Sequence, residues 1–526
     1  MNAPGAPLAT RHRAAAVVVL VRGAAHLLET FWVKRADTLS FMPGFRAFIG
    51  GSVDAEDAEL VVEGAEGTDA LERACAIRET FEEAGVLIGV ANPGTLEQLA
   101  EARTRLLVGE ASFVQLAREH GWRFRADALT CVGRWITPPF APVRFESPYF
   151  LARMPAGQHA DIRVGELVEG DWITPVEALG RWQRGDETFA APILYTLVAL
   201  AHGDAGIEEL IAESAETMER PVQRIELKWG IVMVPQLTRP LPPATHTNAY
   251  LIGEPEMALV DPGSDDPESL RQLFAVIDAL VQDRRKLKLV VLTHHHPDHI
   301  AGLAAVRQRF KVPVFAHAET ARHLKVDALV KDSEVIPLLP GVGGDWNLEV
   351  LHTPGHTRGH ISLFHRRTGS LLTGDHIPGG KGTVIIDPPE GDMGDYLRSL
   401  ERLRALPVTT LFPGHGGPHG AAQLRIRQLI EHRLERERKV FASLEALTQD
   451  SGATLSELVE VAYADTPREL WSYAERSLLA HLLKLEQDGR ARHADDQWRL
   501  AAAQVPAPAK LVEDSPASAR ATRRRK

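Results

Sequence analysis

Hydrophobic and polar positions divide the chain into regions of different pattern. From about residue 12 to 215, apolar strand-like runs alternate with helical stretches, which predicts an α/β or α+β domain. Over residues 222–425 the order strand, loop and helix repeats, and over 426–502 the pattern becomes mainly helical. A chain of 526 residues is too long for one core, so we expect three domains. The flanking segments, 1–11 and 503–526, are expected to be disordered, and the second ends in a basic Arg-Arg-Arg-Lys.

The individual elements are predicted from short apolar runs and from helical periodicity. The expected strands are Ala14–Val21, Leu27–Lys34, Tyr149–Arg153, Ala249–Leu251, Ala258–Val260, Leu287–Leu292, Val314–Phe315 and Ser370–Leu372. The expected helices are Ala70–Ala84, Glu208–Arg220, Ile300–Phe310, Ile426–Leu444, Thr454–Ala462 and Ala474–Gln487. Pro221 follows the second helix, so the first domain boundary is expected there. The last three helices, closed by a hairpin over residues 489–500, have the outline of a winged helix.

Composition narrows the class of protein but not its reaction. The chain is 44% hydrophobic and 25% charged, as soluble globular proteins are, and its formal net charge is −11. This charge argues against a surface built mainly to hold nucleic-acid backbone, although it does not exclude a local basic groove. Cys75 and Cys131 lie in no metal-like or redox-like spacing, so free thiols in a reducing compartment are expected.

Neither a membrane span nor a targeting segment is predicted. No run approaches the roughly 20 apolar residues that cross a bilayer. Residues 14–21 superficially imitate a signal peptide, but the run is short and ends at Arg22-Gly23 without a small-residue cleavage site. We therefore expect a cytoplasmic protein with no membrane partner.

The strongest chemical signal is the run Thr-His-His-His-Pro-Asp-His at residues 293–299. It follows a predicted buried strand, and in an extended loop His294 and His296 project to the same side. Asp298 and His299 come next, just before a predicted helix. Imidazole nitrogen and carboxylate oxygen are direct ligands of divalent ions such as zinc. Because four donors within six residues cannot all reach one ion with good geometry, two adjacent ions are expected.

Three more donors lie at loop positions downstream. His356 stands in Thr-Pro-Gly-His-Thr, Asp375 in Leu-Leu-Thr-Gly-Asp-His and His415 in Phe-Pro-Gly-His-Gly. A glycine precedes each of them, as close backbone packing around a buried ion favours.

In this order, the donors resemble those of the metallo-β-lactamase superfamily over residues 222–425. The resemblance implies two ion-binding groups that share a bridging Asp375: His294, His296 and His356 hold one ion, and Asp298, His299 and His415 hold the other. It also implies two Zn²⁺ ions (or Mn²⁺ or Fe) with a water or hydroxide between them that attacks the substrate, because coordination lowers the pKa of water towards about 7. Asp298 is expected to serve catalysis as well as metal binding.

Other polar residues of this region are expected to support the centre rather than to bind metal. His295, His352, His360, His376 and His419 form this set. Asp261, in Leu-Val-Asp-Pro-Gly, resembles the buried aspartate that orients the metal loop in the superfamily.

A second signal lies on the helix predicted over Ala70–Ala84, which Gly85 can cap. Its polar face carries Glu79, Glu82 and Glu83 at spacings of three and four residues. Carboxylates so close repel one another unless a cation binds them. Oxygen ligands favour a hard ion such as Mg²⁺ or Mn²⁺.

The string Arg-Glu-Thr-Phe-Glu-Glu-Ala-Gly-Val at residues 78–86 resembles the core of the Nudix box, and Gly50-Gly51 resembles its opening. The resemblance covers residues 12–215 and implies that the three glutamates hold Mg²⁺ against a diphosphate, with Glu82 and Glu83 catalytic. Gly51 lies 27 residues before Arg78, a longer interval than the family's, as in the branch that includes coenzyme A diphosphatases. Counted back from Arg78, the position of the box's first glutamate holds Ala70.

The C-terminal region resembles the winged helix that follows the catalytic domain in the β-lactamase-like protein 2 group. The resemblance rests on His432–Arg438, on Leu470-Trp471 and on Arg476–Glu486. The expected fold class is therefore multidomain: a Nudix α/β/α sandwich, a metallo-β-lactamase αβ/βα sandwich and a small helical winged-helix domain. The winged helix has two open roles, nucleic-acid binding and a packing or homodimer module.

Three functions compete at this point. In the first, the metallo-β-lactamase part cleaves single-stranded RNA as a phosphodiesterase, and the Nudix part hydrolyses a nucleoside diphosphate derivative related to coenzyme A. In the second, the metallo-β-lactamase part is a thioesterase like glyoxalase II, acting on acyl-coenzyme A or similar thioesters. In the third, the chain is a nucleic-acid-binding or docking protein with vestigial catalysis. The intact metal donors argue against this third function. An RNA enzyme predicts a basic groove beside the histidine loops, and a thioesterase predicts an apolar channel.

Overall fold

The structure is a computed structural model that describes residues 12–24, 27–137, 144–216, 225–240, 244–342, 344–380, 382–447 and 452–501. Its contacts divide the chain into one unit over Met1–Leu434 and another over Glu435–Lys526. The predicted terminal segments 1–11 and 503–526, and the predicted boundary at Pro221, lie outside the described residues. The first unit holds two of the expected domains.

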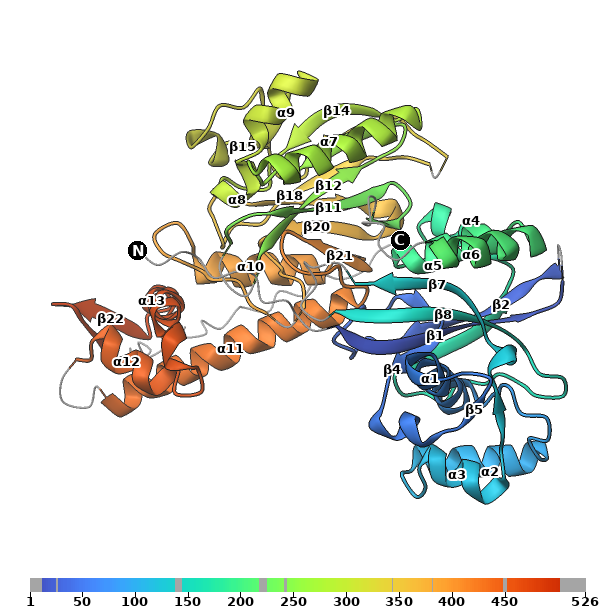
Figure 1. The fold of residues 1–526 in the computed structure, drawn as a ribbon. Helices are drawn as coiled ribbons and strands as arrows, with labels where there is room; N and C mark the ends of the chain where they lie inside the picture. Colours follow the sequence, from blue (N-terminus) through green and yellow to red (C-terminus); the bar gives the residue numbers. More distant parts are fainter. Residues whose placement is uncertain are drawn as a thin grey trace, which may run out of the picture. The chain divides into compact units, whose positions relative to one another are not determined.

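The N-terminal domain is built on a seven-stranded sheet in the order β3-β2-β1-β8-β7, with β4 paired to β1 and β9 paired to β2 (Figure 1). Its strands are β1 (Arg13–Arg22), β2 (Glu29–Arg35), β3 (Arg46–Ala47), β4 (Ile49–Ser52), β7 (Thr130–Ile136), β8 (Phe145–Arg153) and β9 (Leu167–Ile173). Along β1, Val18 and Leu20 pack into one core while Val19 and Val21 pack into another. This alternation follows from the two-residue period of a strand and places apolar side chains on both faces of the sheet.

Helices cover both faces of this sheet, as an α/β/α sandwich requires (Figure 1). One face bears α1 (Gly67–Ala84), α2 (Leu96–Leu107) and α3 (Phe113–His120); the other bears α4 (Pro175–Arg184), α5 (Ala191–Leu200) and α6 (Asp204–Glu216). Gly85 ends α1 in the left-handed conformation at φ 70°, as predicted. Between β4 and α1 the chain inserts the 3₁₀ turn η2 (Ala55–Glu59) and the short β5 (Val62–Glu63), which pairs with β6 (Phe124–Arg125).

Two further sheets form the next domain. One has the order β10-β11-β12-β13-β14-β15-β16 and the other the order β17-β18-β19-β20-β21. The strands of the first are β10 (Ile225–Lys228), β11 (Ile231–Leu237), β12 (His246–Ile252), β13 (Glu256–Val260), β14 (Lys286–Val291), β15 (Val314–His317) and β16 (Ala328–Val330). Those of the second are β17 (Val335–Ile336), β18 (Leu348–His352), β19 (Ile361–His365), β20 (Ser370–Gly374) and β21 (Thr410–Pro413).

The cores of this domain show how its layers are ordered. Tyr250 and Ile252 of β12 pack with Ile361 and Leu363 of β19, so the two sheets face each other. Ala249 and Leu251 point the opposite way, into a core shared with α7. The helices are α7 (Pro267–Gln282), α8 (Pro297–Ile300), α9 (Leu303–Phe310) and α10 (Met393–Arg404). The arrangement is the predicted αβ/βα sandwich.

The second unit has its own small core. It comprises the end of α11 (Ala422–Leu447), α12 (Leu455–Ala462), α13 (Trp471–Gln487) and the hairpin of β22 (Ala491–Ala494) and β23 (Gln497–Leu500). Trp498 of the hairpin is 2% exposed and packs with Leu458 and Leu482 of the helices. This is the predicted winged-helix outline, although α11 begins earlier and runs through the boundary expected at residue 426.

The predicted elements all occur where the chain is described, with ends shifted by a few residues. One difference touches the chemistry: Asp298 and His299 do not precede the helix but lie within the short α8, which stops before α9 begins. Cys75 and Cys131 are not joined in a disulfide. Among the described helices, none is both long and apolar enough to cross a membrane.

Candidate metal centres

The histidine run leaves the end of β14 and enters α8, and it brings together two groups of donors. In the first group, His294 Nε2 and His356 Nε2 each lie 3.0 Å from His296 Nδ1. Asp375 approaches the same point, with Oδ2 3.6 Å from His356 Nε2 and 3.9 Å from His294 Nε2. All four ligand atoms lie within 4.8 Å of one another.

The second group is Asp298, His299 and His415, whose ligand atoms also lie within 4.8 Å of one another. His415 Nε2 is 3.2 Å from Asp298 Oδ2 and 3.4 Å from His299 Nε2. Asp375 reaches this group too, with Oδ1 3.2 Å from His299 Nε2 and Oδ2 3.3 Å from His415 Nε2. The structure thus brings all seven predicted donors together and places the Asp375 carboxylate between the two groups.

Hydrogen bonds behind the histidines decide which ring nitrogen faces the centre. His299 Nδ1 lies 2.8 Å from Asp261 Oδ2, His415 Nδ1 2.8 Å from the His246 carbonyl and His356 Nδ1 3.1 Å from the Ile385 carbonyl. These oxygens only accept hydrogen bonds, so in these three rings Nδ1 carries a proton and Nε2 is the nitrogen that faces the centre.

The inward atoms need a cation between them. His294 Nε2 and His356 Nε2 each lie 3.0 Å from His296 Nδ1, and His299 Nε2 lies 3.2 Å from Asp375 Oδ1, so nitrogen and oxygen atoms that can bind metal converge in both groups. Asp375 Oδ1 is buried and has no hydrogen-bond partner among the described residues. Imidazole and carboxylate donors in two such groups match the ligand chemistry of divalent ions. The residues therefore fit a pair of metal ions.

The protonation of the histidines agrees with this arrangement. Burial lowers the pKa of His294 well below its usual value and that of His356 to about 4, so both rings are neutral. Burial also acts to lower the pKa of His415, but the carboxylates of Asp375 and Asp298 outweigh it and raise that pKa to about 10. The second group thus attracts positive charge, which a divalent ion supplies in place of a proton.

The glycine before each downstream donor is required by packing. A Cβ at Gly414 would lie 2.6 Å from Asp375 Oδ1 and 2.8 Å from His299 Cε1. One at Gly374, where φ is +47°, would lie 2.6 Å from His360 Nε2. At Gly355 it would overlap Tyr396. The close backbone approach predicted from the sequence is therefore present at all three positions.

Asp261 holds the metal loop from behind, as its resemblance to the superfamily's buried aspartate predicts. It is 2% exposed and its Oδ1 accepts a hydrogen bond of 2.8 Å from the Thr293 amide. Its Oδ2 accepts from Thr293 Oγ1 at 2.6 Å and from His299. One buried carboxylate therefore fixes both the start of the loop and the ring of a donor.

The remaining histidines of the region take supporting positions. His360 Nε2 accepts a 3.2 Å hydrogen bond from the Asp375 amide, and its Nδ1 lies 2.8 Å from Thr353 Oγ1. His295 stacks on His323 with ring centroids 3.7 Å apart. The others contact neighbouring backbone or an aromatic ring: His352 approaches the Arg358 carbonyl, His376 lies against Tyr396, and His419 accepts from the Ala421 amide.

Sequence reasoning missed the polar start of β12, which supports the His415 loop. The Asn248 amide donates to the Gly414 carbonyl at 2.7 Å, and Asn248 Nδ2 donates to the Gly416 carbonyl at 2.8 Å. Thr247 Oγ1 lies 3.4 Å from Asp298 Oδ2. The available signal was the run Thr-His-Thr-Asn at residues 245–248, which is unusually polar for the start of a buried strand.

The glutamates of α1 form a different kind of centre. Burial raises the pKa of Glu79 to about 7 and that of Glu83 to about 8. The Gly50 amide donates to Glu83 Oε2 at 3.0 Å, while the side chain of Glu82 is 40% exposed. A Cβ at Gly51 would overlap the Glu79 carboxylate, so the Gly-Gly pair of β4 lets the strand approach the helix. Oxygen donors of this kind suit Mg²⁺ or Mn²⁺.

Arg78 contacts Glu79 and Glu82 of this group, and its main partner is a carboxylate that the sequence analysis did not identify. The guanidinium makes two hydrogen bonds to Asp57, of 2.7 and 3.0 Å, and one of 2.8 Å to Glu79. Counted back from Arg78, the position of the box's first glutamate holds Ala70, which has no carboxylate. The carboxylate that pairs with Arg78 belongs to Asp57, which lies in η2, six residues after Gly51.

Comparison with known proteins agrees with this geometry. Three family models match consecutive parts of the chain: the NUDT19 Nudix domain over residues 61–200, the metallo-beta-lactamase superfamily over 242–415 and the beta-lactamase associated winged helix domain over 454–498. The three predicted folds and their order are therefore confirmed, and the first two families imply divalent metals. The chain is a metal-dependent hydrolase.

Individual relatives cover different parts. The "Beta-lactamase-like protein 2 homolog" of Drosophila melanogaster is 31% identical over 266 residues, which is 48% of this chain and 87% of that protein. A "Hydroxyacylglutathione hydrolase" of Bdellovibrio bacteriovorus is 34% identical over 154 residues, 29% of this chain and 55% of the relative. The crystal structure of a Nudix hydrolase from Alicyclobacillus acidocaldarius, 32% identical, covers 37% of this chain and 92% of its own, with a TM-score of 0.33.

Proposed function

Because the chain belongs to the β-lactamase-like protein 2 family and carries a Nudix domain N-terminal to the metallo-β-lactamase domain, we propose that it is a hydrolase with two separate metal centres. The histidine centre holds two ions, Zn²⁺ or else Mn²⁺ or Fe. The glutamate centre holds Mg²⁺ or Mn²⁺ and hydrolyses a nucleoside diphosphate-linked substrate related to coenzyme A.

The observation that carries the proposal is the convergence of seven donors on two points that share Asp375. When bound there, divalent ions supply a hydroxide nucleophile at neutral pH and polarise the bond under attack. The protein's own part is to aim the donors: Asp261 and the carbonyls of His246 and Ile385 hold the rings of His299, His415 and His356 with Nε2 inward. The side chains of Asp298 and His415 are 18% and 15% exposed, so substrate can approach on their side.

For the glutamate centre, the support is the burial of carboxylates without enough cations to balance them. Arg78 is the only cation paired with the three glutamates among the described residues, and Asp57 takes two of its hydrogen bonds. A hard divalent ion would balance the remaining charge and hold a diphosphate against Glu79, Glu82 and Glu83, with Glu82 and Glu83 serving catalysis.

For the histidine centre, we propose a phosphodiester of single-stranded RNA as the substrate. Support comes from the winged helix, a module that can hold nucleic acid, and from the family resemblance seen in the sequence. The second candidate is a thioester such as an acyl-coenzyme A. The 34% identity to a hydroxyacylglutathione hydrolase favours it.

The test uses Asp298→Ala and Glu82→Ala, each with a surface control on its own domain. Asp265→Ala serves for the first, because Asp265 is exposed and near the metal loop in sequence, and Glu97→Ala on α2 serves for the second. Wild type and variants are assayed with Zn²⁺ or Mn²⁺ against single-stranded RNA and acyl-coenzyme A, and with Mg²⁺ against free coenzyme A.

Asp298→Ala should remove the RNA or thioester activity and lower the bound metal measured by mass spectrometry, while coenzyme A hydrolysis remains. Glu82→Ala should do the reverse. If Asp298→Ala left every activity and the metal content intact, the two-ion centre would be wrong. If Glu82→Ala left diphosphate hydrolysis intact, the Nudix domain would supply a fold only.

A further inference from the structure

A cavity of about 950 Å³ lies between the Nudix domain and the metallo-β-lactamase domain, both within the first unit. The α1 glutamates line one part of it. The other domain contributes Ile225, Leu227, Met233 and the loop 416–419, which directly follows the donor His415. The seven histidine-centre donors are not part of the lining. The cavity therefore belongs to the glutamate centre, and the second domain supplies one of its walls.

This wall is held in place by contacts between the two domains. The Gly420 amide donates to the Pro43 carbonyl at 3.0 Å, and a Cβ at Gly44 would lie 2.9 Å from the Gly420 carbonyl carbon. Phe45 of the Nudix domain is 1% exposed and belongs to the core cluster of the other domain. Such packing makes the loop 416–419 a fixed boundary of the cavity.

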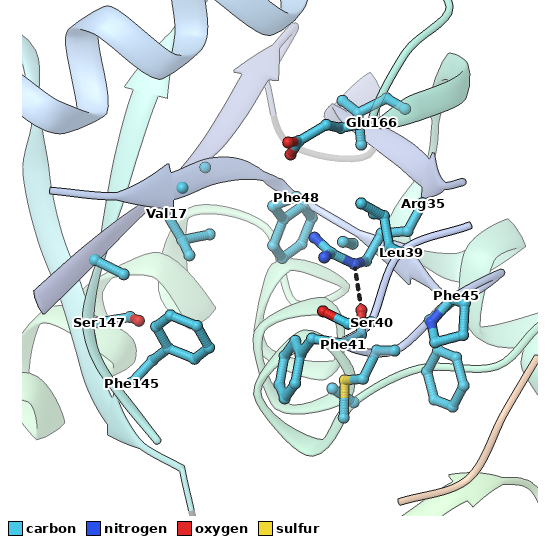
Figure 2. A pocket seen from close by; sticks show the side chains of 18 of the residues that line it. Val17, Arg35, Leu39, Ser40, Phe41, Phe45, Phe48, Phe145, Ser147 and Glu166 are labelled. Carbon is cyan, nitrogen blue, oxygen red and sulfur yellow. Dashed lines mark hydrogen bonds between the residues drawn. The ribbon is translucent and has the colours of Figure 1, made fainter. Parts of the chain in front are cut away.

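One end of the cavity is suited to phosphate. Figure 2 shows the Arg35 side chain reaching into the cavity, where its Nε donates to the Phe41 carbonyl at 3.1 Å. Among the described residues this guanidinium makes that one hydrogen bond, and Glu83 and Glu166 act on it only through their charge, opposing the lowering of its pKa by burial. Its two terminal nitrogens therefore keep donors for a ligand. Guanidinium binds phosphate oxygens strongly in surroundings of low polarity, and the glutamates nearby supply the metal-binding partners.

The rest of the cavity is suited to an apolar group. Phe41 and Phe145 meet edge to face with ring centroids 5.5 Å apart, and Figure 2 shows both rings together with Phe48. Beyond them lie the apolar side chains of the second domain named above. The volume is at the upper end of ordinary ligand pockets, so a diphosphate alone would leave most of it unfilled.

We propose that this cavity binds a whole diphosphate-linked substrate, with the diphosphate at Arg35 and the α1 glutamates and a long apolar group against the wall supplied by the metallo-β-lactamase domain. The second domain thereby sets the length of substrate that the first domain accepts. This inference rests on the proposed Nudix function and extends it to the substrate's apolar portion.

Gly417 allows a test from the far wall without touching the Nudix residues. It is exposed, its φ is not in the left-handed region, and a Cβ there meets nothing within 4 Å. Gly417→Phe therefore adds a ring at a position that lines the cavity, with little backbone strain. Gly382→Phe is the matched control, because Gly382 lies in the same domain, also has open space and does not line the cavity.

The full chain and both variants are assayed with Mg²⁺ against octanoyl-coenzyme A, which carries a long apolar arm, and against ADP-ribose, which does not. Gly417→Phe should lower the ratio of kcat/KM for the two substrates about tenfold, or 1.4 kcal/mol. Gly382→Phe should leave the ratio unchanged. Calorimetry of octanoyl-coenzyme A binding, with Ca²⁺ in place of Mg²⁺, should show the same tenfold weakening in Gly417→Phe only. Bound metal measured on each variant reports whether the neighbouring histidine centre is intact.

The outcomes separate this inference from the proposed function. If the wild type hydrolyses neither compound but binds octanoyl-coenzyme A more tightly than Gly417→Phe does, the diphosphatase function fails and the cavity assignment stands. If the two proteins bind octanoyl-coenzyme A equally, the assignment of the apolar group to this wall is overturned. An unchanged kcat/KM ratio in Gly417→Phe overturns it as well.

Discussion

The two candidate metal centres of this chain differ in how their donors are held. In the histidine centre, an outer hydrogen bond fixes three of the five rings: Asp261 holds His299, and carbonyl oxygens hold His356 and His415. In the glutamate centre, the donors lie along one helix, and an arginine of that same helix contacts Glu79 and Glu82 directly. The first centre is preorganised for metal, whereas in the second a metal ion must compete with Arg78.

The difference follows from donor chemistry. An imidazole ring binds metal through a single lone pair, so its orientation must be set by a partner at the other nitrogen. A carboxylate has two oxygens and a full charge, so it can exchange an arginine for a metal ion without turning far. A histidine site is therefore built by several segments of the fold, while a glutamate site can be built by one helix.

The largest effect is expected from Asp375→Asn, which removes the carboxylate that both histidine groups share. Hydrolysis by the histidine centre should fall to the level of buffer alone, and the metal content measured by mass spectrometry should fall with it. Diphosphate hydrolysis with Mg²⁺ should persist, because the glutamate centre does not use this residue. Asp265→Asn is the control, and an unchanged metal content in Asp375→Asn would contradict the shared role.

Asp57→Ala disrupts the glutamate centre by removing the main hydrogen-bond partner of Arg78. The Asp57 side chain is fully buried and that of Arg78 is 13% exposed, so removing one partner should cost about 3–5 kcal/mol in the free energy of unfolding of this domain. Urea denaturation measures it. Asp69→Ala removes a surface pair with Arg73 on the same helix, where Asp69 is 50% exposed, and should cost less than about 1 kcal/mol. Equal losses in the two variants would show that Asp57 is no special support.

Asp261→Asn tests outer control of the histidine centre. The amide cannot accept from both Thr293 and His299 as the carboxylate does, so the His299 ring loses its fixed orientation. Metal affinity measured by competition with a chelator should fall about 10–100-fold. Asp278→Asn, which breaks a surface pair with Arg309, is the control. Affinity retained in Asp261→Asn would mean that the fold orients His299 without its help.

The smallest effect is expected in the second unit, away from both centres. Hydrogen bonds from Arg436 and Lys439 hold the pKa of Asp465 well below its usual value. Because the folded-state pKa is lowered, this stabilisation is present above the unfolded value of 3.8 and is lost as the pH falls below it. Asp465 is 46% exposed, so Asp465→Asn should cost less than about 1 kcal/mol at neutral pH. Denaturation curves should converge with the wild type in acid; a constant difference would exclude the charge effect.

Much of the fold could be predicted because its strands and helices carry strong local patterns. The alternation along β1 and the helical period of α1 are complete within single elements. The same holds for His294 and His296, whose spacing of two residues places both on one side of an extended loop. Asp57 was missed for the opposite reason. The number of residues between Asp57 and Arg78 depends on an inserted segment, and no local sequence pattern predicts the length of that segment.

The support of His415 by β12 and the interdomain cavity could not be predicted at all. Asn248 and Gly414 are far apart in sequence, and only the closed sandwich brings their amide and carbonyl to 2.7 Å. The wall formed by residues 416–419 lies against the Nudix domain because Phe45 is buried in the core of the other domain. The hydrophobic periodicity of the sequence does not predict a contact between two domains.

The sequence by itself determined which donors this protein has, their spacing within each loop and the order of its three domains. These depend on residue type and on backbone geometry over a few residues. The tertiary structure alone decided which nitrogen of each histidine faces inward, which acid pairs with Arg78 and which domain closes the cavity beside Arg35. Each of these depends on hydrogen bonds and packing between segments that only the folded core brings together.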